Sequence, residues 1–362
     1  MGKTGVSVTE TTIGRALRGL TMENDLISTT LVLDQGADIV SLFYKPRMIE
    51  AMYQAPWQAR EPGVGAMQAV DQFTEWCQYF RGGWSLLFPN LGAPVSYKGA
   101  TLDRHGEAAR TVWQLEDAKT TAKEVSITVA TSLLCLPFRI KRVLTLRAGI
   151  PVLEMQETVT NEGLEPMDCL WFDQPLFGQP LLSPDSFIDT GAHTVWTDDG
   201  LQAAFDEPGI DLPPGQTWTW PEGLDKKGSR VDLSRVPPYD PSSGHTRLVI
   251  LRDFVGHWIA LTNPTLGIGV GIVWDGEILP YAYLYQETGG WRNYPYFGRA
   301  YMMGLAPASS YPTQGLDVVR GTTGTQLTLA AGESRVLMLR VVFYEGAKRV
   351  SSIDLQGAIV RR

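Results

Sequence analysis

Short runs of alternating apolar and polar residues recur along the sequence, and Gly, Pro or Asn separates one run from the next. The run from Leu26 to Pro46 holds two such segments around Asp34–Gly36, which is the pattern of a β-hairpin. The same alternation of β-branched residues is found in segments 123–134, 138–163, 247–274 and 333–346. A period of two places every second side chain on the same face of a strand. The sequence therefore predicts an all-β chain.

Helical periodicity is weak, and the best helix candidate is the short segment 66–79. The predicted strands are spaced regularly and no charged or Ser-rich linker interrupts them, which favours one large antiparallel β-sandwich over several small domains. We therefore predict a single sandwich domain over residues 1–362. Residues 208–241 are rich in Pro and Gly and lack a strand period, so they are predicted to form a long loop that packs on the sandwich.

Composition narrows the classes of function. Acidic residues outnumber basic residues by 39 to 31, and a net charge of -8 argues against a nucleic-acid partner. No run approaches the roughly eighteen apolar residues that cross a bilayer, so neither a membrane span nor a signal peptide is predicted. Cys77, Cys135 and Cys169 are far apart and form no CxxC pair, which favours a reducing compartment. We expect a cytoplasmic protein without a membrane partner.

No motif indicates a cofactor or a metal. The glycines of Gly267–Gly271 lack the GxGxxG spacing and the following helix of a dinucleotide site. The 4 His residues form no HxH or HExxH pattern, so no transition-metal site is predicted. His193, His245 and His257 are expected to be structural or solvent-facing.

Two segments resemble a known family of sugar isomerases. The runs RGGWSLLFPNLG, from Arg81 to Gly92, and HGEAARTVWQL, from His105, are similar to motifs of the aldose 1-epimerases, and most similar to those of the hexose-phosphate 1-epimerases. Segments 157–163, 171–182, 283–290 and 296–312 follow in the order that this family has. The resemblance implies the galactose-mutarotase-like β-sandwich and a small carbohydrate as the binding partner.

Enzymes of this family interconvert the α and β anomers of a sugar, for which a base and an acid must act on opposite sides of the ring. The resemblance places the usual acid, a His before Pro, at Gln174, and the usual base, a Glu before Pro, at Ala306. Neither side chain transfers a proton at neutral pH. Two functions stay open: an isomerase with a shifted acid and base, and a carbohydrate-binding protein of the same fold without catalysis.

Three other residues are candidates for proton transfer. His105 matches the HG motif of the family, and the glycine after it lets the backbone approach a ligand. Glu287 ends a predicted strand beside a Gly-Gly turn, where sheets present ligand contacts. Asp173 adjoins Gln174, but strand alternation turns it to the opposite face unless a bulge intervenes. We predict His105 and Glu287 as the catalytic pair, with Asp173 as the alternative to Glu287.

Sugars bind by laying C–H faces on aromatic rings while their hydroxyls meet polar groups. The densest aromatic run, 281–301, supplies rings, and nearby arginines supply guanidinium forks for hydroxyls, carboxylate or phosphate. In the hexose-phosphate relatives, an arginine at the RGG motif lies near the sugar or its phosphate. The predicted substrate-binding residues are Arg81, Gln174, Tyr285, Trp291, Arg292 and Arg299.

Overall fold

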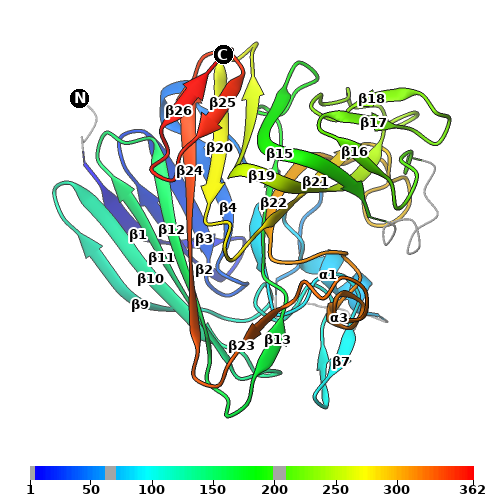
Figure 1. Ribbon diagram of the computed structural model, residues 1–362. Coiled ribbons are helices and arrows are strands. Elements are labelled where there is room, and N and C mark those ends of the chain that lie inside the picture. The colour runs from blue at the N-terminus through cyan, green and yellow to red at the C-terminus, as the bar shows by residue number, and fades with distance from the viewer. Residues whose placement is uncertain (1–4, 62–70, 199–208) are drawn as a thin grey trace.

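The computed structural model describes residues 5–61, 71–198 and 209–362, and most of its regular structure is β-strand (Figure 1). Eighteen of the described strands join one sheet in which all the recorded pairings are antiparallel. The prediction of an all-β antiparallel sandwich is confirmed. The predicted hairpin around Asp34–Gly36 is present, as β3 (Ile27–Val32) paired with β4 (Asp38–Tyr44).

One layer of the sandwich runs from the edge strand β9 to β20, each strand pairing with the next. Its strands are β9 (Gln114–Thr120), β10 (Glu124–Ser132), β11 (Phe138–Arg147), β12 (Val152–Asn161), β24 (Ser334–Glu345) and β20 (Ile268–Trp274). In β11 every second residue is buried, as the alternation in its sequence predicts.

The other layer runs from β1 to β21. With β3 and β4, its strands are β1 (Ser7–Ile13), β2 (Leu17–Glu23), β6 (Trp84–Leu87), β14 (Phe172–Phe177), β22 (Tyr301–Ala308) and β21 (Tyr281–Thr288). Figure 1 shows β1–β3 together with β9–β12 on one side of the molecule, and β21 and β22 on the other side.

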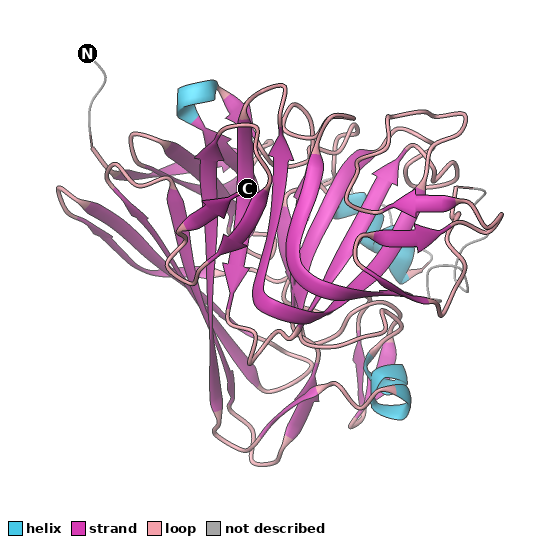
Figure 2. Ribbon diagram, turned by 45° about the horizontal axis from the view of Figure 1, so that its top comes forward, coloured by secondary structure: helices cyan, strands magenta, loops and turns pink. Residues whose placement is uncertain are grey.

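A single long strand, β19 (Thr246–Asn263), links the two layers. Its first part pairs with β21 and its last part with β20, while β15 (Phe187–Thr197) pairs along its other edge. A strand that is shared in this way must bend, and Figure 2 shows strongly curved strands in this half of the molecule. The curved half holds the cavity described below.

Short elements complete the fold. Gln72–Tyr79 forms helix α1, which agrees with the predicted helix, although residues 66–70 lie outside the described residues. The remaining helices and strands are η1 (Lys45–Arg47), α3 (Leu316–Thr322), β5 (Ile49–Glu50), β7 (Val95–Tyr97), β8 (Ala100–Leu102), β13 (Met167–Cys169), β16 (Thr217–Thr219), β17 (Glu222–Leu224), β18 (Arg230–Asp232), β23 (Leu327–Leu329), β25 (Val350–Ile353) and β26 (Ile359–Arg361). None of the described helices is long and apolar enough to cross a membrane.

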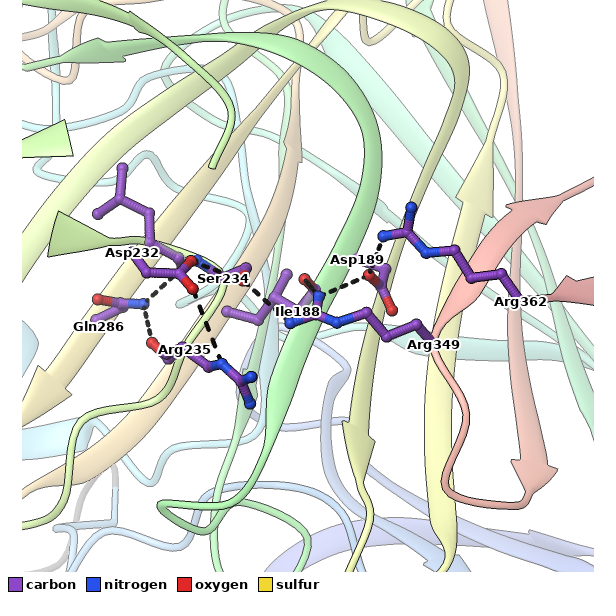
Figure 3. Close-up of polar contacts among 9 residues, drawn as sticks. Ile188, Asp189, Asp232, Ser234, Arg235, Gln286, Arg349 and Arg362 are labelled. Atoms are coloured by element: carbon purple, nitrogen blue, oxygen red, sulfur yellow. Dashed lines mark hydrogen bonds and ion pairs between the residues drawn. The ribbon is translucent and has the colours of Figure 1, made fainter. Parts of the chain in front are cut away.

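The predicted long loop 208–241 contains three of these short strands, β16 to β18, in its described part. A polar network ties this segment to the sheet (Figure 3). Gln286 of β21 donates to two carbonyls of segment 233–235, at 3.1 Å each. Arg349 donates to Asp189 of β15 at 2.8 Å and to the Ser234 hydroxyl at 3.3 Å. The segment is therefore anchored next to β21.

Charged side chains from both layers contact one another inside the core. Arg142 in β11 and Glu157 in β12 are register partners on the buried faces of their strands, and they form an ion pair. Arg142 Nη2 also lies 3.1 Å from Oδ1 of Asp173, which belongs to β14 in the other layer. The indole N–H groups of Trp171 and Trp84 donate to Glu157 and Asp173. These contacts bind the two layers together through polar groups.

Asp38 of β4 is another fully buried carboxyl near this cluster. Burial raises the pKa of Asp38 to about 7, and this effect outweighs the Ser85 hydroxyl donating at 2.8 Å and the charges of Arg142 and Arg81. Because the pKa is higher in the folded chain than in the unfolded chain, the fold favours the protonated form. The stabilisation of the folded chain by protonated Asp38 is fully present below the ordinary Asp pKa of about 4, and it is lost as the pH rises through 7.

We therefore expect Asp38→Asn, which keeps an acceptor for Ser85, to raise the free energy of unfolding at pH 8. The increase at pH 8 should exceed that at pH 5 by roughly 1–3 kcal/mol. Urea denaturation at the two pH values measures this difference. The matched control is Asp185→Asn at an exposed site, which should change stability equally at both pH values. A gain from Asp38→Asn that is no larger at pH 8 would contradict the account of this buried carboxyl.

Candidate functional site

A cavity of about 370 Å³ lies on one face of strands β14, β21 and β22. Alternation sends every second side chain of these strands into it. The floor includes Gln174, Tyr283, Tyr285, Met302, Gly304 and Ala306. In the pairing of β14 with β22, Phe172 lies opposite Ala308 and Leu176 lies opposite Gly304. Gln174 and Ala306 lie between these two pairs, so they are neighbours on the floor. A pocket of this size is typical of a small-molecule site.

Helix α1 and several loops cover the floor. The side chain of Asp71 caps the helix by accepting from the Thr74 amide at 2.8 Å. Phe73, Trp76 and Cys77 line the cavity, and their spacing of three and four residues places them on one face of the helix. The sequence pattern identified this helix only weakly, because one face packs over a cavity instead of a continuous core.

Aromatic rings dominate the walls. Phe73 stacks with Trp291 at 6.4 Å between centroids, and Trp291 meets Tyr296 edge-on at 5.7 Å. Of the predicted binding rings, Tyr285 and Trp291 both line the cavity. Trp76 lines it too, whereas Trp84 is fully buried in the core. The cavity therefore offers several ring faces to a ligand.

His105 lies in the cavity wall on the loop after β8. Its ring packs against Trp76 at 4.8 Å, and Nδ1 accepts from the Gly92 amide at 3.3 Å. Burial and the neighbouring charge of Arg104 lower the pKa of His105 to about 3. The imidazole is therefore neutral at physiological pH and, with Nδ1 accepting, carries its proton on Nε2. It can donate a hydrogen bond to a ligand but is a weak base.

The glycines of the two family-like motifs serve close packing. A Cβ on Gly82 would lie 2.1 Å from the carbonyl oxygen of Tyr53, and one on Gly106 would lie 2.3 Å from that of Phe88. Both residues also have positive φ, at 83° and 77°. The motifs thus hold the loops that carry Arg81 and His105 against the sheet.

Glu287 lies behind the cavity wall and does not line it. Its carboxylate accepts from the Thr246 hydroxyl at 2.7 Å and from the amides of Gly289 and Trp291 at 3.0 and 3.2 Å, so it holds the loop that carries Trp291. Burial raises the pKa of Glu287 to about 7 in spite of these hydrogen bonds. The hydroxyl of Tyr285, which does line the cavity, is 3.4 Å from Glu287 Oε2.

Asp173 points into the core, because Gln174 occupies the cavity face of β14. Burial and the charge of Glu157 raise the pKa of Asp173 well above its ordinary value, against the opposing charge of Arg142. Asp173 therefore has no contact with the cavity and acts in the polar cluster of the core.

The three arginines predicted to bind substrate all lie outside the cavity lining. Arg81 donates to the Gln35 side chain at 3.2 Å and to the Arg60 carbonyl at 3.0 Å. Arg292 donates to the Ser242 carbonyl at an exposed position. Arg299 lies over the rings of Trp57 and Phe297, at 5.7 and 5.8 Å. Local backbone and ring contacts engage these guanidinium groups.

Arg104 is in the lining, and sequence reasoning did not select it. Its position directly before His105 was the available signal. Thr313 and Gln314, from the loop after β22, were also missed, because nothing in the sequence places that loop beside β14. Within the described ranges, no group of three or more His, Cys, Asp or Glu residues could hold a metal ion.

No protein-family model and no curated protein matches the sequence. The structure, however, is similar to solved structures that include proteins described as galactose mutarotase-like or, provisionally, as aldose 1-epimerases. A protein of Klebsiella pneumoniae, provisionally described as an aldose 1-epimerase, is 15% identical with a TM-score of 0.71, over 94% of this chain and 84% of that chain. A galactose mutarotase-like protein of Clostridium acetobutylicum is 14% identical with a TM-score of 0.65, over 94% and 99%.

A third structure, from Escherichia coli K12 and also provisionally described as an aldose 1-epimerase, is 15% identical with a TM-score of 0.60, over 94% of this chain and all of that one. At such identities the likeness shows the fold. The galactose-mutarotase-like sandwich that the sequence motifs implied is therefore confirmed as the fold of this chain.

Proposed function

We propose that the protein binds a cyclic sugar or sugar derivative in the cavity between α1 and strands β14, β21 and β22. The observation that best supports this proposal is the composition of the cavity lining. It combines a few polar groups with the aromatic rings of Trp76, Tyr285, Trp291 and Tyr296. Rings accept the C–H faces of a sugar, and polar tips orient its hydroxyls. The shared fold supports a carbohydrate ligand, since one structural neighbour is provisionally described as an aldose 1-epimerase and another as galactose mutarotase-like.

The proposed reaction is isomerisation of the aldose 1-epimerase type. Glu287 takes the proton of the C1 hydroxyl through the hydroxyl of Tyr285, which gives its own proton to Glu287 as it receives that of the sugar. The C1–O5 bond then breaks, and the neutral imidazole of His105 donates a hydrogen bond to the developing charge on O5. Neutral imidazoles have such a role in other isomerases. Rotation about C1–C2 and ring closure, with return of the proton, give the other anomer.

A second candidate is a carbohydrate-binding protein without catalysis. Gln174 and Ala306 both line the cavity floor, where the resemblance to the aldose 1-epimerases placed the acid and the base. His105 is uncharged and Glu287 reaches the cavity only through another side chain. These observations favour a site that holds a sugar by packing and hydrogen bonding alone.

Calorimetric titration with a panel of hexoses and hexose derivatives tests sugar binding. We expect at least one sugar to bind, and we expect Ala306→Phe to abolish its binding because the new ring occupies the floor of the cavity. Val255→Phe, at an exposed site outside the cavity lining, is the matched control and should bind as the parent does. Unaltered affinity in a folded Ala306→Phe variant would refute the assignment of the cavity.

Exchange NMR with the same sugars separates the two candidates. Anomer interconversion faster than in buffer supports the isomerase. Binding with interconversion at the buffer rate for every sugar supports the binding protein.

A further inference from the structure

A row of aromatic rings leads from the cavity to the surface of the protein. Phe73, in the cavity lining, stacks with Trp291 at 6.4 Å between centroids and meets Tyr294 edge-on at 6.0 Å. Tyr294 in turn meets Phe297 edge-on at 6.2 Å. Trp291 is buried, whereas Tyr294 is 39% exposed and Phe297 is 57% exposed. The last two rings therefore lie outside the cavity and continue its aromatic wall into solvent.

The loop that carries these rings folds back on the cavity wall. The Phe297 amide donates to the Asn293 carbonyl at 2.9 Å, and the Gly298 amide donates to the Trp291 carbonyl at 2.7 Å. Phe297 has a φ of 50°, in the left-handed region that bulky residues rarely adopt. Core packing does not account for this conformation, because most of the Phe297 side chain is exposed. Strained backbone of this kind is common at ligand-binding sites.

Polar groups flank the exposed rings. The Arg299 guanidinium, on an exposed side chain, lies over the rings of Phe297 and Trp57, at 5.8 and 5.7 Å from their centroids. The Tyr294 hydroxyl donates to the Thr74 carbonyl of α1 at 3.4 Å, which holds this ring at the edge of the cavity. A ring bordered by polar groups suits a sugar unit, whose C–H face packs on the ring while its hydroxyls form hydrogen bonds. We call Tyr294, Phe297 and Arg299 the outer platform.

We propose that the outer platform binds the second unit of an oligosaccharide whose reducing-end unit occupies the cavity. This inference rests on the proposed function and extends its substrate class from a single sugar to a chain of sugars. Reaction at C1 needs the reducing end beside Tyr285 and His105, so the rest of the chain extends away from these two residues. The row of rings marks its path, since centroid spacings of 6.0 to 6.4 Å are comparable with the length of one pyranose unit.

The test is a set of calorimetric titrations that pairs each monosaccharide with disaccharides carrying it at the reducing end. The pairs are glucose with maltose, cellobiose and isomaltose, galactose with galactobiose, and mannose with mannobiose. We expect at least one disaccharide to bind about 10-fold more tightly than its monosaccharide, because a second sugar unit packs on a ring of the outer platform.

Three variants locate the source of this gain. Phe297→Asn should remove the gain and leave monosaccharide affinity unchanged, because Asn tolerates the left-handed backbone and Phe297 lies outside the cavity lining. Phe297→Trp keeps a ring and should keep the gain. Leu164→Asn is the matched control, since it makes the same apolar-to-amide change at a side chain that is 95% exposed, between β12 and β13. It should bind every sugar as the parent does.

Several results would overturn the inference while the proposed sugar site stands. One is monosaccharide binding without a gain for any disaccharide, and another is a gain that Phe297→Asn retains. Tighter binding of glucose benzylated at O4 or O6 than of every disaccharide would assign the platform to an apolar substituent. A dimer in sedimentation velocity that Phe297→Asn dissociates would assign it to a second copy of this chain. If neither monosaccharides nor disaccharides bind, the proposed function itself fails.

Discussion

Replacement of Tyr285 by Phe is expected to lower the rate of enzyme-catalysed anomer interconversion by about 100- to 10,000-fold, the range typical of general acid–base groups. The change removes one oxygen from the cavity wall and leaves the ring in place. Because the hydroxyl of Tyr285 lies 3.4 Å from Glu287 and the Tyr285 side chain lines the cavity, loss of this hydroxyl removes the proposed proton path from the sugar to the carboxylate. Exchange NMR at saturating sugar measures the rate, and calorimetry on the same variant shows whether the sugar still binds.

The pH profile provides an independent check of this route. Glu287 must be ionised to accept a proton, and its pKa is raised to about 7 by burial. The rate at low sugar concentration should therefore fall about tenfold per pH unit below 7. Glu287→Gln should be as slow as Tyr285→Phe, but it also disturbs the loop amides that the carboxylate holds. His105→Gln keeps a donor and should be affected less. A Tyr285→Phe variant with the parental rate would exclude the proposed route.

Replacement of Arg142 by Met is expected to lower the free energy of unfolding by about 3–5 kcal/mol, because it leaves the buried Glu157 without its counter-charge and removes a hydrogen-bond donor to Asp173. Arg142 is 1% exposed and contacts Glu157 in its own layer and Asp173 in the other. Denaturant unfolding monitored by tryptophan fluorescence measures the loss. Since Trp84 and Trp171 donate to the same carboxylates, their emission should report the change directly.

The matched control is Arg139→Met on the same strand. Arg139 is 41% exposed and pairs with Glu116 at the surface, where an ion pair contributes about 0–1 kcal/mol. A loss in Arg142→Met no greater than in this control would show that the core cluster does not hold the layers together.

The fold could be predicted from the sequence because its signal is local. Alternation in β11 and β12 is regular, and the same alternation sets Arg142 and Glu157 among the buried positions. Arg142 and Glu157 lie close to Asp173 only because of the way in which the two layers face each other. Sequence periodicity does not contain that information.

The same local alternation accounts for the part of the candidate site that could be predicted. Alternation correctly separates Gln174, which lines the cavity, from Asp173, which faces the core. It cannot distinguish Tyr285 at the cavity from Glu287 behind it, because the turn after β21 folds back and uses the carboxylate for its own amides. The arginines were selected by residue type, and their backbone and ring partners become visible only in three dimensions. Arg104 lies on the loop after β8, where no strand periodicity indicates that its side chain lines the cavity.

Hydrogen exchange of the backbone amides, with and without a saturating sugar from the panel, tests the central claim most directly. The claim is that a carbohydrate occupies the cavity roofed by α1. We predict slower exchange in segments 72–80, 91–93, 104–106 and 283–296, with no change in the edge strands β1 and β9. A sugar that binds without slowing exchange in these segments, or that protects a different part of the sheet, would contradict the account.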